Sequence, residues 1–296
     1  MTDLTDGALL LAGQKRQPSW AFRLAFETYG TTVGIESTER RLIEKVREIA
    51  SKSFLGRLKV IEDCDFCSVD FVFGLAVNET GTFQLWEDGA FLSEAEKESD
   101  FERHLTGYLR VRVAEHARPW VFAHAGVVAL NGKVVVLPGR SFSGKTTLVA
   151  ELIRNGADYY SDEYAVFDEE GSVHPFARDL SVRPDGNRIA PVQVGINELG
   201  GNPATRAAKV GLVLFTEYVP GSVWRPERLT QGNAIKELIP HTIPIRRNTA
   251  FSMKVLKAVV SRAIMLKGLR SDAHSFSKTL LSFMEDDSNW SEMTLQ

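Results

Sequence analysis

The stretch VFAHAGVVALNGKVVVLPGRSFSGKTTLVAELIR, residues 121–154, decides the fold of the C-terminal part of the chain. Two apolar runs flank Asn131-Gly132, a dipeptide that strongly predicts a two-residue β-hairpin turn. Counting outward from this turn, Leu130 faces Lys133, and the register continues along both strands. The sequence therefore predicts that His124 lies opposite Gly139.

The second strand of this hairpin leads into GRSFSGKT, residues 139–146, which matches the pattern GxxxxGK[ST] in full. An apolar strand precedes the motif and an apolar helical pattern follows it, as a phosphate-binding loop requires. Backbone amides and the positive end of the helix bind phosphate oxygens in such loops. Lys145 is expected to reach the β- and γ-phosphates, and the Thr146 hydroxyl to bind Mg²⁺. The predicted ATP site consists of Gly139, Arg140, Ser141, Phe142, Ser143, Gly144, Lys145, Thr146 and Thr147.

A phosphate-binding loop needs an acidic partner for Mg²⁺ or for the nucleophile, and the chain offers two candidates. Asp162 and Glu163 follow the short strand-like segment ADYYS, residues 157–161. Glu217 follows the apolar run VGLVLFT, residues 210–216. An apolar strand that ends in an acid is the commoner arrangement, so periodicity alone favours Glu217.

Four arginines near these segments are further candidates. A guanidinium group can stabilise the charge of a transferred phosphoryl group through paired hydrogen bonds. Two of them, Arg178 and Arg183, follow the acidic pair, and the others are Arg246 and Arg247.

The composition is that of an ordinary globular protein. The chain has 296 residues, of which 44% are hydrophobic and 25% charged, so disordered and collagen-like classes are excluded. A formal net charge of -3 gives no global attraction to nucleic acid or to an anionic membrane. There is no run of about 18 apolar residues, and Cys64 and Cys67 are the only cysteines. We therefore predict a cytoplasmic protein without nucleic-acid or membrane partners.

Residues 1–119 have a mixed α and β pattern. A first helix follows Ser37-Thr38, with its apolar face at Leu42, Ile43, Val46, Ile49 and Ala50. A second helix is predicted over residues 100–118, with apolar positions Phe101, Leu105, Leu109 and Val113. CSVDFVF and GTFQLW predict strands, and Cys67, Val69, Phe71 and Phe73 are expected on one buried face. The domains predicted are an accessory or recognition region, 1–119, and a phosphate-loop domain, 120–296.

The order of the C-terminal motifs resembles the kinase domain of the HPr kinase/phosphorylase family. The matching elements are HAG at 124–126, the hairpin into the phosphate loop, ELIRNGADYYSDEYAVF at 151–167 and a short hairpin around DEEG at 168–171. The chain is more similar still to the HPr-kinase-related serine kinases, which include kinases of lasso-peptide precursors. The resemblance implies an α/β P-loop kinase core, with a mixed sheet and an antiparallel hairpin that leads into the phosphate loop.

The resemblance also implies roles for individual residues. In that family a histidine precedes the hairpin and an acidic pair follows the helix of the phosphate loop; these positions correspond to His124 and to Asp162 with Glu163. Asp162 is then the general base or a Mg²⁺ ligand, and Glu163 replaces an acid that is usually aspartate. The glycine-rich signature of true HPr kinase/phosphorylases has no match between Arg178 and Gly200. The resemblance therefore leaves HPr as the substrate and the phosphorylase reaction open.

Together these features predict a phosphotransferase. It would be an ATP- and Mg²⁺-dependent kinase that transfers the γ-phosphoryl group to a serine or threonine hydroxyl of a protein or peptide. One alternative is a nucleotide hydrolase that uses Glu217 to orient water and acts with a partner protein. Another is an ATP-gated binding module, in which the N-terminal region recognises the partner. The sequence leaves the acceptor and the oligomeric state open.

Overall fold

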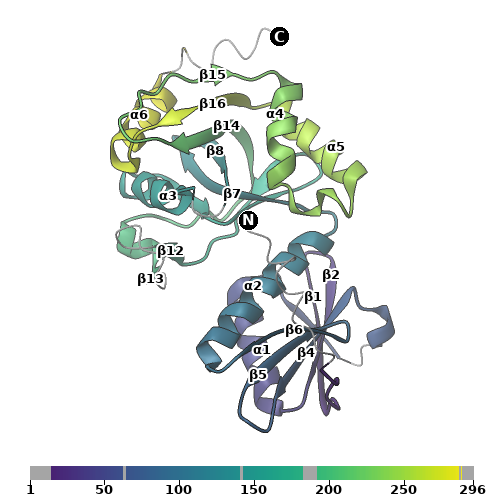
Figure 1. Cartoon of the computed structure of the whole chain (residues 1–296). Helices are drawn as coiled ribbons and strands as arrows, with labels where there is room; N and C mark the ends of the chain where they lie inside the picture. The colour runs from purple at the N-terminus through teal and green to yellow at the C-terminus, as the bar shows by residue number, and fades with distance from the viewer. Residues whose placement is uncertain (1–14, 63–64, 141–142, 183–191, 287, 289–296) are drawn as a thin grey trace. The chain divides into compact units, whose positions relative to one another are not determined.

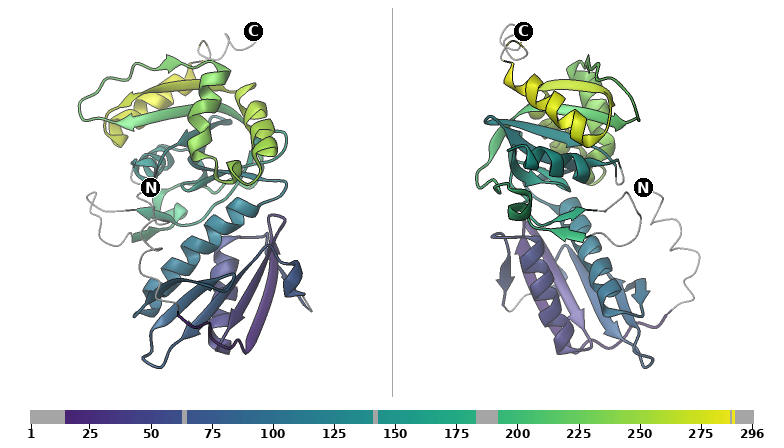
Figure 2. Two further views of the ribbon diagram at one scale, coloured as in Figure 1. Left: turned by 45° about the vertical axis from the view of Figure 1, so that its right-hand side comes forward. Right: turned by 90° about the vertical axis from the view of Figure 1, so that its left-hand side faces the viewer.

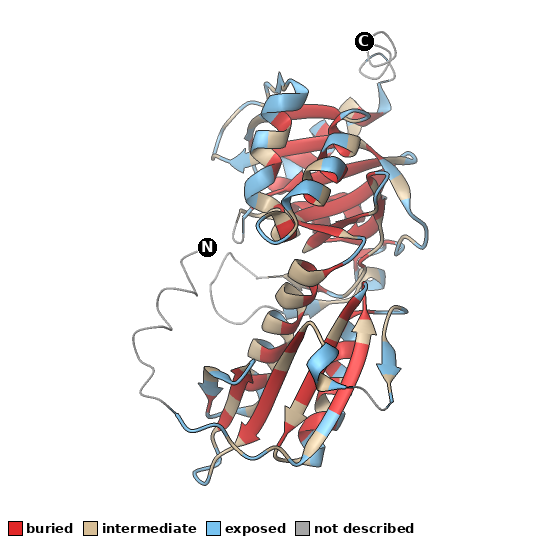
Figure 3. Ribbon diagram, turned by 90° about the vertical axis from the view of Figure 1, so that its right-hand side faces the viewer, coloured by how far each residue is buried: buried red, intermediate tan, exposed pale blue. Residues whose placement is uncertain are grey.

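The computed structural model describes residues 15–62, 65–140, 143–182, 192–286 and 288. The chain divides into two compact units, Met1–Pro119 and Trp120–Gln296 (Figure 1). Both are mixed α/β structures with buried residues on the sheets and on the inward faces of the helices (Figure 3). The predicted α/β class is therefore confirmed. In the part of the chain that the structure describes, no helix has the length and apolar character needed to cross a membrane.

The N-terminal unit is a six-stranded sheet with the order β3-β1-β2-β4-β5-β6. Neighbouring strands are antiparallel except for β2 and β4, which run parallel. The strands are β1 (Phe22–Thr28), β2 (Thr31–Ser37), β3 (Lys59–Ile61), β4 (Phe71–Val77), β5 (Phe83–Glu87) and β6 (Ala90–Ala95).

Two helices, α1 (Arg40–Ser53) and α2 (Glu98–His116), pack on the sheet of this unit. Their buried residues include every apolar position predicted for the two helices. The apolar residues recur every three or four positions, so one stripe of each helix is removed from water. Both predicted helices are confirmed.

The prediction that Cys67 begins a buried strand face is wrong. Cys67 is exposed and lies in a short 3₁₀ turn, η1 (Phe66–Ser68), and the strand begins only at Phe71. The carboxylate of Asp65 accepts a hydrogen bond from the Cys67 amide at 2.9 Å, and the Ser68 hydroxyl donates to the Asp65 carbonyl at 2.7 Å. Such local side-chain bonds to the backbone compete with strand pairing. Cys64 lies outside the described residues.

The C-terminal unit is built on an eight-stranded mixed sheet. Its order is β11-β10-β7-β8-β14-β16-β15, with β9 also paired to β7. The strands are β7 (Val121–Leu130), β8 (Lys133–Pro138), β9 (Asp158–Ser161), β10 (Tyr164–Phe167), β11 (Ser172–His174), β14 (Ala208–Tyr218), β15 (Glu227–Arg228) and β16 (Ile264–Arg270). A separate pair consists of β12 (Leu180–Val182) and β13 (Val192–Val194).

The hairpin of β7 and β8 has the register predicted from Asn131-Gly132. Leu130 pairs with Lys133, and the pairing continues to Ala125 with Pro138. Both turn residues have positive φ, 50° and 74°, as a type I′ turn requires. The amide of Gly139 donates to the carbonyl of His124 at 3.2 Å, so His124 lies beside the start of the phosphate loop.

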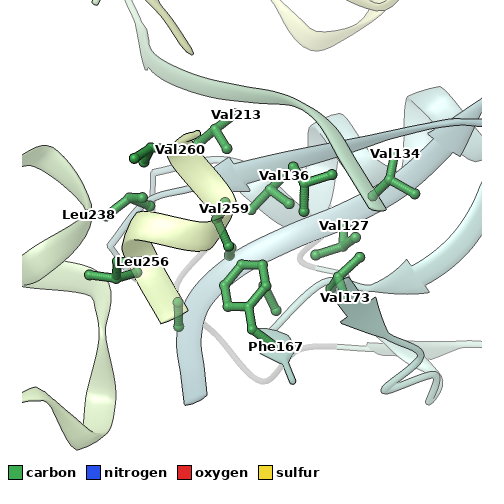
Figure 4. Packing of buried hydrophobic residues seen from close by; sticks show 14 of the residues in the cluster. Val127, Val134, Val136, Phe167, Val173, Val213, Leu238, Leu256, Val259 and Val260 are labelled. Carbon is green, nitrogen blue, oxygen red and sulfur yellow. The ribbon is translucent and has the colours of Figure 1, made fainter. Parts of the chain in front are cut away.

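Five strands of this unit pair in a closed circuit. β11 pairs with β10, β10 with β7, β7 with β8, β8 with β14, and β14 with β11 again. Valine and phenylalanine side chains from these strands pack together and against α5 (Thr249–Val260) and α4 (Gln231–Leu238) (Figure 4). This core fixes the strands that carry the phosphate loop and the acidic pair.

Helices cover the sheet in layers. α4 and α5 pack on the first core, whereas α3 (Lys145–Arg154) and α6 (Ala273–Glu285) pack on a second core formed by the opposite side of β7, β8, β14 and β16 (Figures 1 and 2). The described part of this unit also contains the 3₁₀ turns η3 (Ile196–Leu199), η4 (Ile239–His241) and η5 (Ile243–Ile245). The helix that follows the phosphate loop therefore lies on one defined side of the sheet.

Gly126 lets α3 approach β7 closely. A Cβ atom at this position would meet Cγ2 of Val149 at 2.7 Å. Gly126→Ala is therefore expected to lower the free energy of unfolding by about 1–3 kcal/mol, as overpacking does. Denaturant unfolding measures the loss, which should be smaller in a Val149→Ala background. Gly232→Ala on α4 is the control, because a Cβ there meets nothing within 4 Å; an equal loss in this variant would contradict the explanation.

Candidate active site

The predicted phosphate-binding loop, residues 139–146 and called the phosphate loop below, connects β8 to α3. Gly144, at the N-terminal cap of α3, has φ 79° and ψ 19°, a left-handed conformation that glycine adopts without strain. The amide of Ser143 donates to the carbonyl of Arg140 at 3.2 Å. Of the predicted ATP site, Ser141 and Phe142 lie outside the described residues. The remaining residues of the motif form the connection from strand to helix that the sequence predicts.

The Lys145 ammonium group lies within the loop. Its Nζ donates to the carbonyls of Gly139 at 2.6 Å and Arg140 at 2.8 Å. Burial lowers the pKa of Lys145 to about 8, although the carboxylates of Asp162 and Glu163 act in the opposite direction. The ammonium is therefore poorly solvated and faces negative charge, which suits a group that binds an anion.

Asp162 is directed at the first turn of α3. The hydroxyl of Thr146 donates to its Oδ2 at 3.1 Å, and the hydroxyl of Tyr159 donates to its Oδ1 at 2.9 Å. Asp162 is only 4% exposed. Burial raises the pKa of Tyr159 well above its ordinary value of 10.0, so this hydroxyl remains a donor. Both carboxylate oxygens of Asp162 are thus engaged and the side chain has a fixed orientation.

The acidic pair occupies a kink between β9 and β10, which both pair with β7. The Ser161 hydroxyl accepts hydrogen bonds from the amides of Glu163 at 3.1 Å and Tyr164 at 3.0 Å. The carbonyl of Glu163 accepts from the amide of Ala125 at 3.2 Å. These bonds satisfy the backbone where the ladder is interrupted, and they hold Asp162 and Glu163 beside the strand that contains His124.

Arg178 holds the acidic pair. Its guanidinium lies 2.7 Å from Oε2 of Glu163 and 3.7 Å from Oδ1 of Asp162, and its side chain is 15% exposed. Burial acts against the charge of Arg178, but the two carboxylates outweigh it and raise the pKa of the guanidinium above its ordinary value. Arg183 lies outside the described residues, and Arg246 and Arg247 are exposed.

Glu217, the acid that periodicity favours, lies at the end of the expected strand but on the face of the sheet opposite to α3 and Thr146. It is exposed near the end of β14 and its charge acts on Lys267. Val213 and Phe215 alternate with it and belong to the core under α4 and α5, whereas α3 packs on the opposite side. The geometry therefore brings Asp162, and not Glu217, to Thr146.

His124 lies between the acidic pair and the phosphate loop. Its ring stacks at a tilt on Tyr164, with 5.1 Å between centroids. The pKa of His124 is lowered to about 4, chiefly by burial and also by the Lys145 ammonium, against the effect of a hydrogen bond with the Glu163 backbone. The imidazole is therefore neutral at pH 7.

A second histidine, His241, belongs to this site and is not predicted by the sequence. Thr242 forms an antiparallel β-bridge with Ala123, which places His241 beside His124. The pKa of His241 is lowered to about 4, chiefly by burial and also by the nearby Lys145 and Arg140 charges, whereas Glu237 acts in the opposite direction. The residue lies in a 3₁₀ turn between two prolines, so no periodic pattern indicates it.

Arg270 also contacts the loop without a sequence signal. It is 3% exposed, and its guanidinium donates to the carbonyls of Ser143 and Gly144, both at 3.3 Å. Burial lowers its pKa, and Tyr218 and Asp272 oppose this. The residue ends β16, far from the motif in sequence, so only the fold brings it to the loop.

The two buried histidines predict how stability depends on pH. Because the pKa of each is lowered to about 4 in the folded chain, the unfolded chain takes up protons first as the pH falls. The free energy of unfolding should therefore decrease from about pH 6.5, the ordinary pKa of histidine, toward pH 4. His241→Asn should flatten this decrease in denaturant unfolding between pH 7.5 and 4.5. His274→Asn, at an exposed position, is the control; equal slopes in both variants would refute the assignment.

The chain matches no protein-family model and no curated protein sequence. The function is therefore argued from the residues and geometry of the site.

Proposed function

We propose that the protein is an ATP- and Mg²⁺-dependent kinase that transfers the γ-phosphoryl group to a serine or threonine hydroxyl of a protein or peptide. The observation that carries this proposal is the 3.1 Å hydrogen bond from Thr146 to Asp162, at the helix that follows the phosphate loop. A hydroxyl and a carboxylate in this relation form the oxygen pair to which Mg²⁺ is held in phosphate-loop enzymes.

The donor set fits the magnesium salt of ATP. Mg²⁺ prefers oxygen ligands and is usually held by one or two protein groups together with phosphates. Here the protein oxygens would be those of Thr146 and Asp162. Lys145 and the loop amides would hold the phosphates. When bound, Mg²⁺ neutralises charge on the phosphates and orients the terminal phosphoryl group.

The residues of the acidic pair have different surroundings, which supports different roles. Asp162 is buried and engaged by two hydroxyl donors, so we assign it to the metal. The Glu163 side chain is 26% exposed and is oriented by Arg178 at 2.7 Å. Glu163 is therefore the acid that an approaching hydroxyl can reach. We assign it the role of general base, which takes the proton from the acceptor hydroxyl. The neutral imidazole of His124 adjoins the same space and can accept a hydrogen bond from that hydroxyl.

The class of acceptor rests on the resemblance to the HPr-kinase-related serine kinases and on the presence of a second folded unit. The unit Met1–Pro119 is a compact domain of its own, large enough to recognise a macromolecule. The hydrolase alternative relies on Glu217, whose charge neighbours Lys267 and whose strand face is opposite to α3. The geometry thus favours Asp162 over Glu217 at the metal, and the choice of a hydroxyl acceptor rests on the resemblance.

The proposal is tested with γ-labelled ATP, Mg²⁺ and a lysate of the source cells, followed by mass spectrometry to locate the label. We expect phosphoserine or phosphothreonine on a protein or peptide, and no such label with Asp162→Asn. Label only in inorganic phosphate, at a rate indifferent to added protein, would refute the kinase. Label on a metabolite would retain the chemistry and overturn the substrate class.

A further inference from the structure

Arg270 connects the phosphate loop to an exposed aromatic ring. Its guanidinium carbon lies 5.5 Å from the ring centroid of Tyr218, while its NH2 group donates to the Ser143 and Gly144 carbonyls. A Cβ on Gly144 would meet the same NH2 group at 2.7 Å. The contact between arginine and loop is therefore close, and Nε of Arg270 is buried with no hydrogen-bond partner among the residues that the structure describes.

The Tyr218 ring is exposed to solvent beside a buried arginine. It is 48% exposed, although it pairs in register with the buried Arg270 on the parallel strand β16. Leu212 and Leu214, which alternate with Tyr218 on β14, belong to the core under α3 and α6. The tyrosine ring therefore stands on the same side of the sheet as the phosphate loop, one strand away from β8.

In the strand order, the acidic pair and His124 are separated from Tyr218 and Arg270 by β8. Asp162, Glu163 and His124 are carried by β7 and by the chain between β9 and β10, whereas Tyr218 and Arg270 end β14 and β16. Parallel α/β sheets bind their ligands beyond the carboxyl ends of the strands. The parallel strands β8, β14 and β16 have their carboxyl ends at the same edge of the sheet. Tyr218 therefore lies at the same strand edge as the phosphate loop, on the side away from the acids, where the base of a nucleotide with its terminal phosphate near Asp162 has room to extend.

We propose that Tyr218 is the stacking platform for the adenine of ATP, and that Arg270 holds this ring against the phosphate loop. This inference rests on the proposed function and adds the base-binding site to it. A purine has a flat π-face that stacks on an aromatic ring. The Arg270 guanidinium would support one face of the Tyr218 ring by a cation–π contact, and the purine would stack on the other face. Stacking does not read hydrogen-bonding edges, so the platform serves adenine and guanine alike.

The test compares two ligands that differ by the nucleoside. Binding of Mg-ATP and of Mg-tripolyphosphate to the full chain is measured by calorimetry. Tyr218→Ala is expected to weaken ATP binding by about five- to 100-fold and to leave tripolyphosphate binding unchanged. Tyr218→Phe should keep the affinity for ATP, because the ring remains. Leu269→Ala, at a 47% exposed neighbour on the other face of β16, should change neither affinity.

Two results would overturn the inference. One is an unchanged affinity for ATP in Tyr218→Ala, and the other is an equal loss for ATP and tripolyphosphate, which would show that the substitution only distorts the loop. The outcome is separate from that of the kinase assay. If Tyr218→Ala selectively loses ATP binding but the kinase assay of the unmodified protein finds no phosphorylated acceptor, the proposed function is refuted. The assignment of Tyr218 to the base is then still supported.

Discussion

Asp162→Asn is expected to slow phosphoryl transfer by about 10²- to 10³-fold. A catalytic metal contributes several kcal/mol of charge stabilisation, and about 1.4 kcal/mol corresponds to a tenfold rate change. The substitution removes the charge that faces Thr146 but keeps an oxygen that can accept its hydrogen bond. Single-turnover assays at increasing Mg²⁺ concentration measure the effect, and the Mg²⁺ concentration for half-maximal rate should rise.

Glu217→Gln is the matched control for this experiment. It also exchanges a carboxylate for an amide, but at an exposed position on the strand face opposite to α3. We expect a rate close to that of the unmodified protein. The reverse ranking of the two variants would favour the hydrolase alternative and would remove Asp162 from the metal site.

Lys145→Ala is expected to reduce turnover by about 10²- to 10³-fold, the usual effect of losing one preorganised donor to a charged transition state. The fold should persist, because the hydrogen bonds of Nζ within the described residues go to the Gly139 and Arg140 carbonyls, and the loop conformation depends on its glycines. Turnover and ATP affinity are measured together with thermal unfolding. Lys209→Ala, which removes an exposed lysine from β14, is the control. A folded Lys145→Ala protein with unchanged turnover and affinity would refute the site.

The same lysine gives ATP binding a pH dependence. Burial lowers its pKa to about 8 in the free chain, and bound phosphate would favour the charged form. Binding therefore takes up a proton above pH 8, and the affinity for ATP should fall as the pH rises beyond that value. The Lys145→Ala variant should lack this decrease.

Features encoded within a short stretch of sequence could be predicted. The Asn131-Gly132 turn determines the register of β7 and β8, and the spacing of apolar residues determines α1 and α2. The glycines and the lysine of the phosphate loop lie next to each other in the chain. Each of these signals acts over a few residues, so no knowledge of the tertiary structure is needed.

Features that depend on the tertiary structure could not be predicted from pattern alone. His241 reaches the site through a single β-bridge, and Arg270 reaches it because β16 pairs with β14. The position of Asp162 after a short strand-like segment made it a candidate, but periodicity favours Glu217, and only the family resemblance favours Asp162. For Glu217 the strand was correctly predicted, but the side of the sheet on which α3 packs is not contained in that strand.

The strand β7 is bonded to the segments that carry the phosphate loop, the acidic pair and His241. β8, with the phosphate loop, pairs along one edge, β9 and β10 with the acids along the other, and Thr242 bridges to Ala123. An opening that frees β7 would separate the loop, the acids and His241 in one event. The amides of β7 are therefore expected to exchange with deuterated solvent only through unfolding of the whole unit, more slowly than those of the short pair β12 and β13.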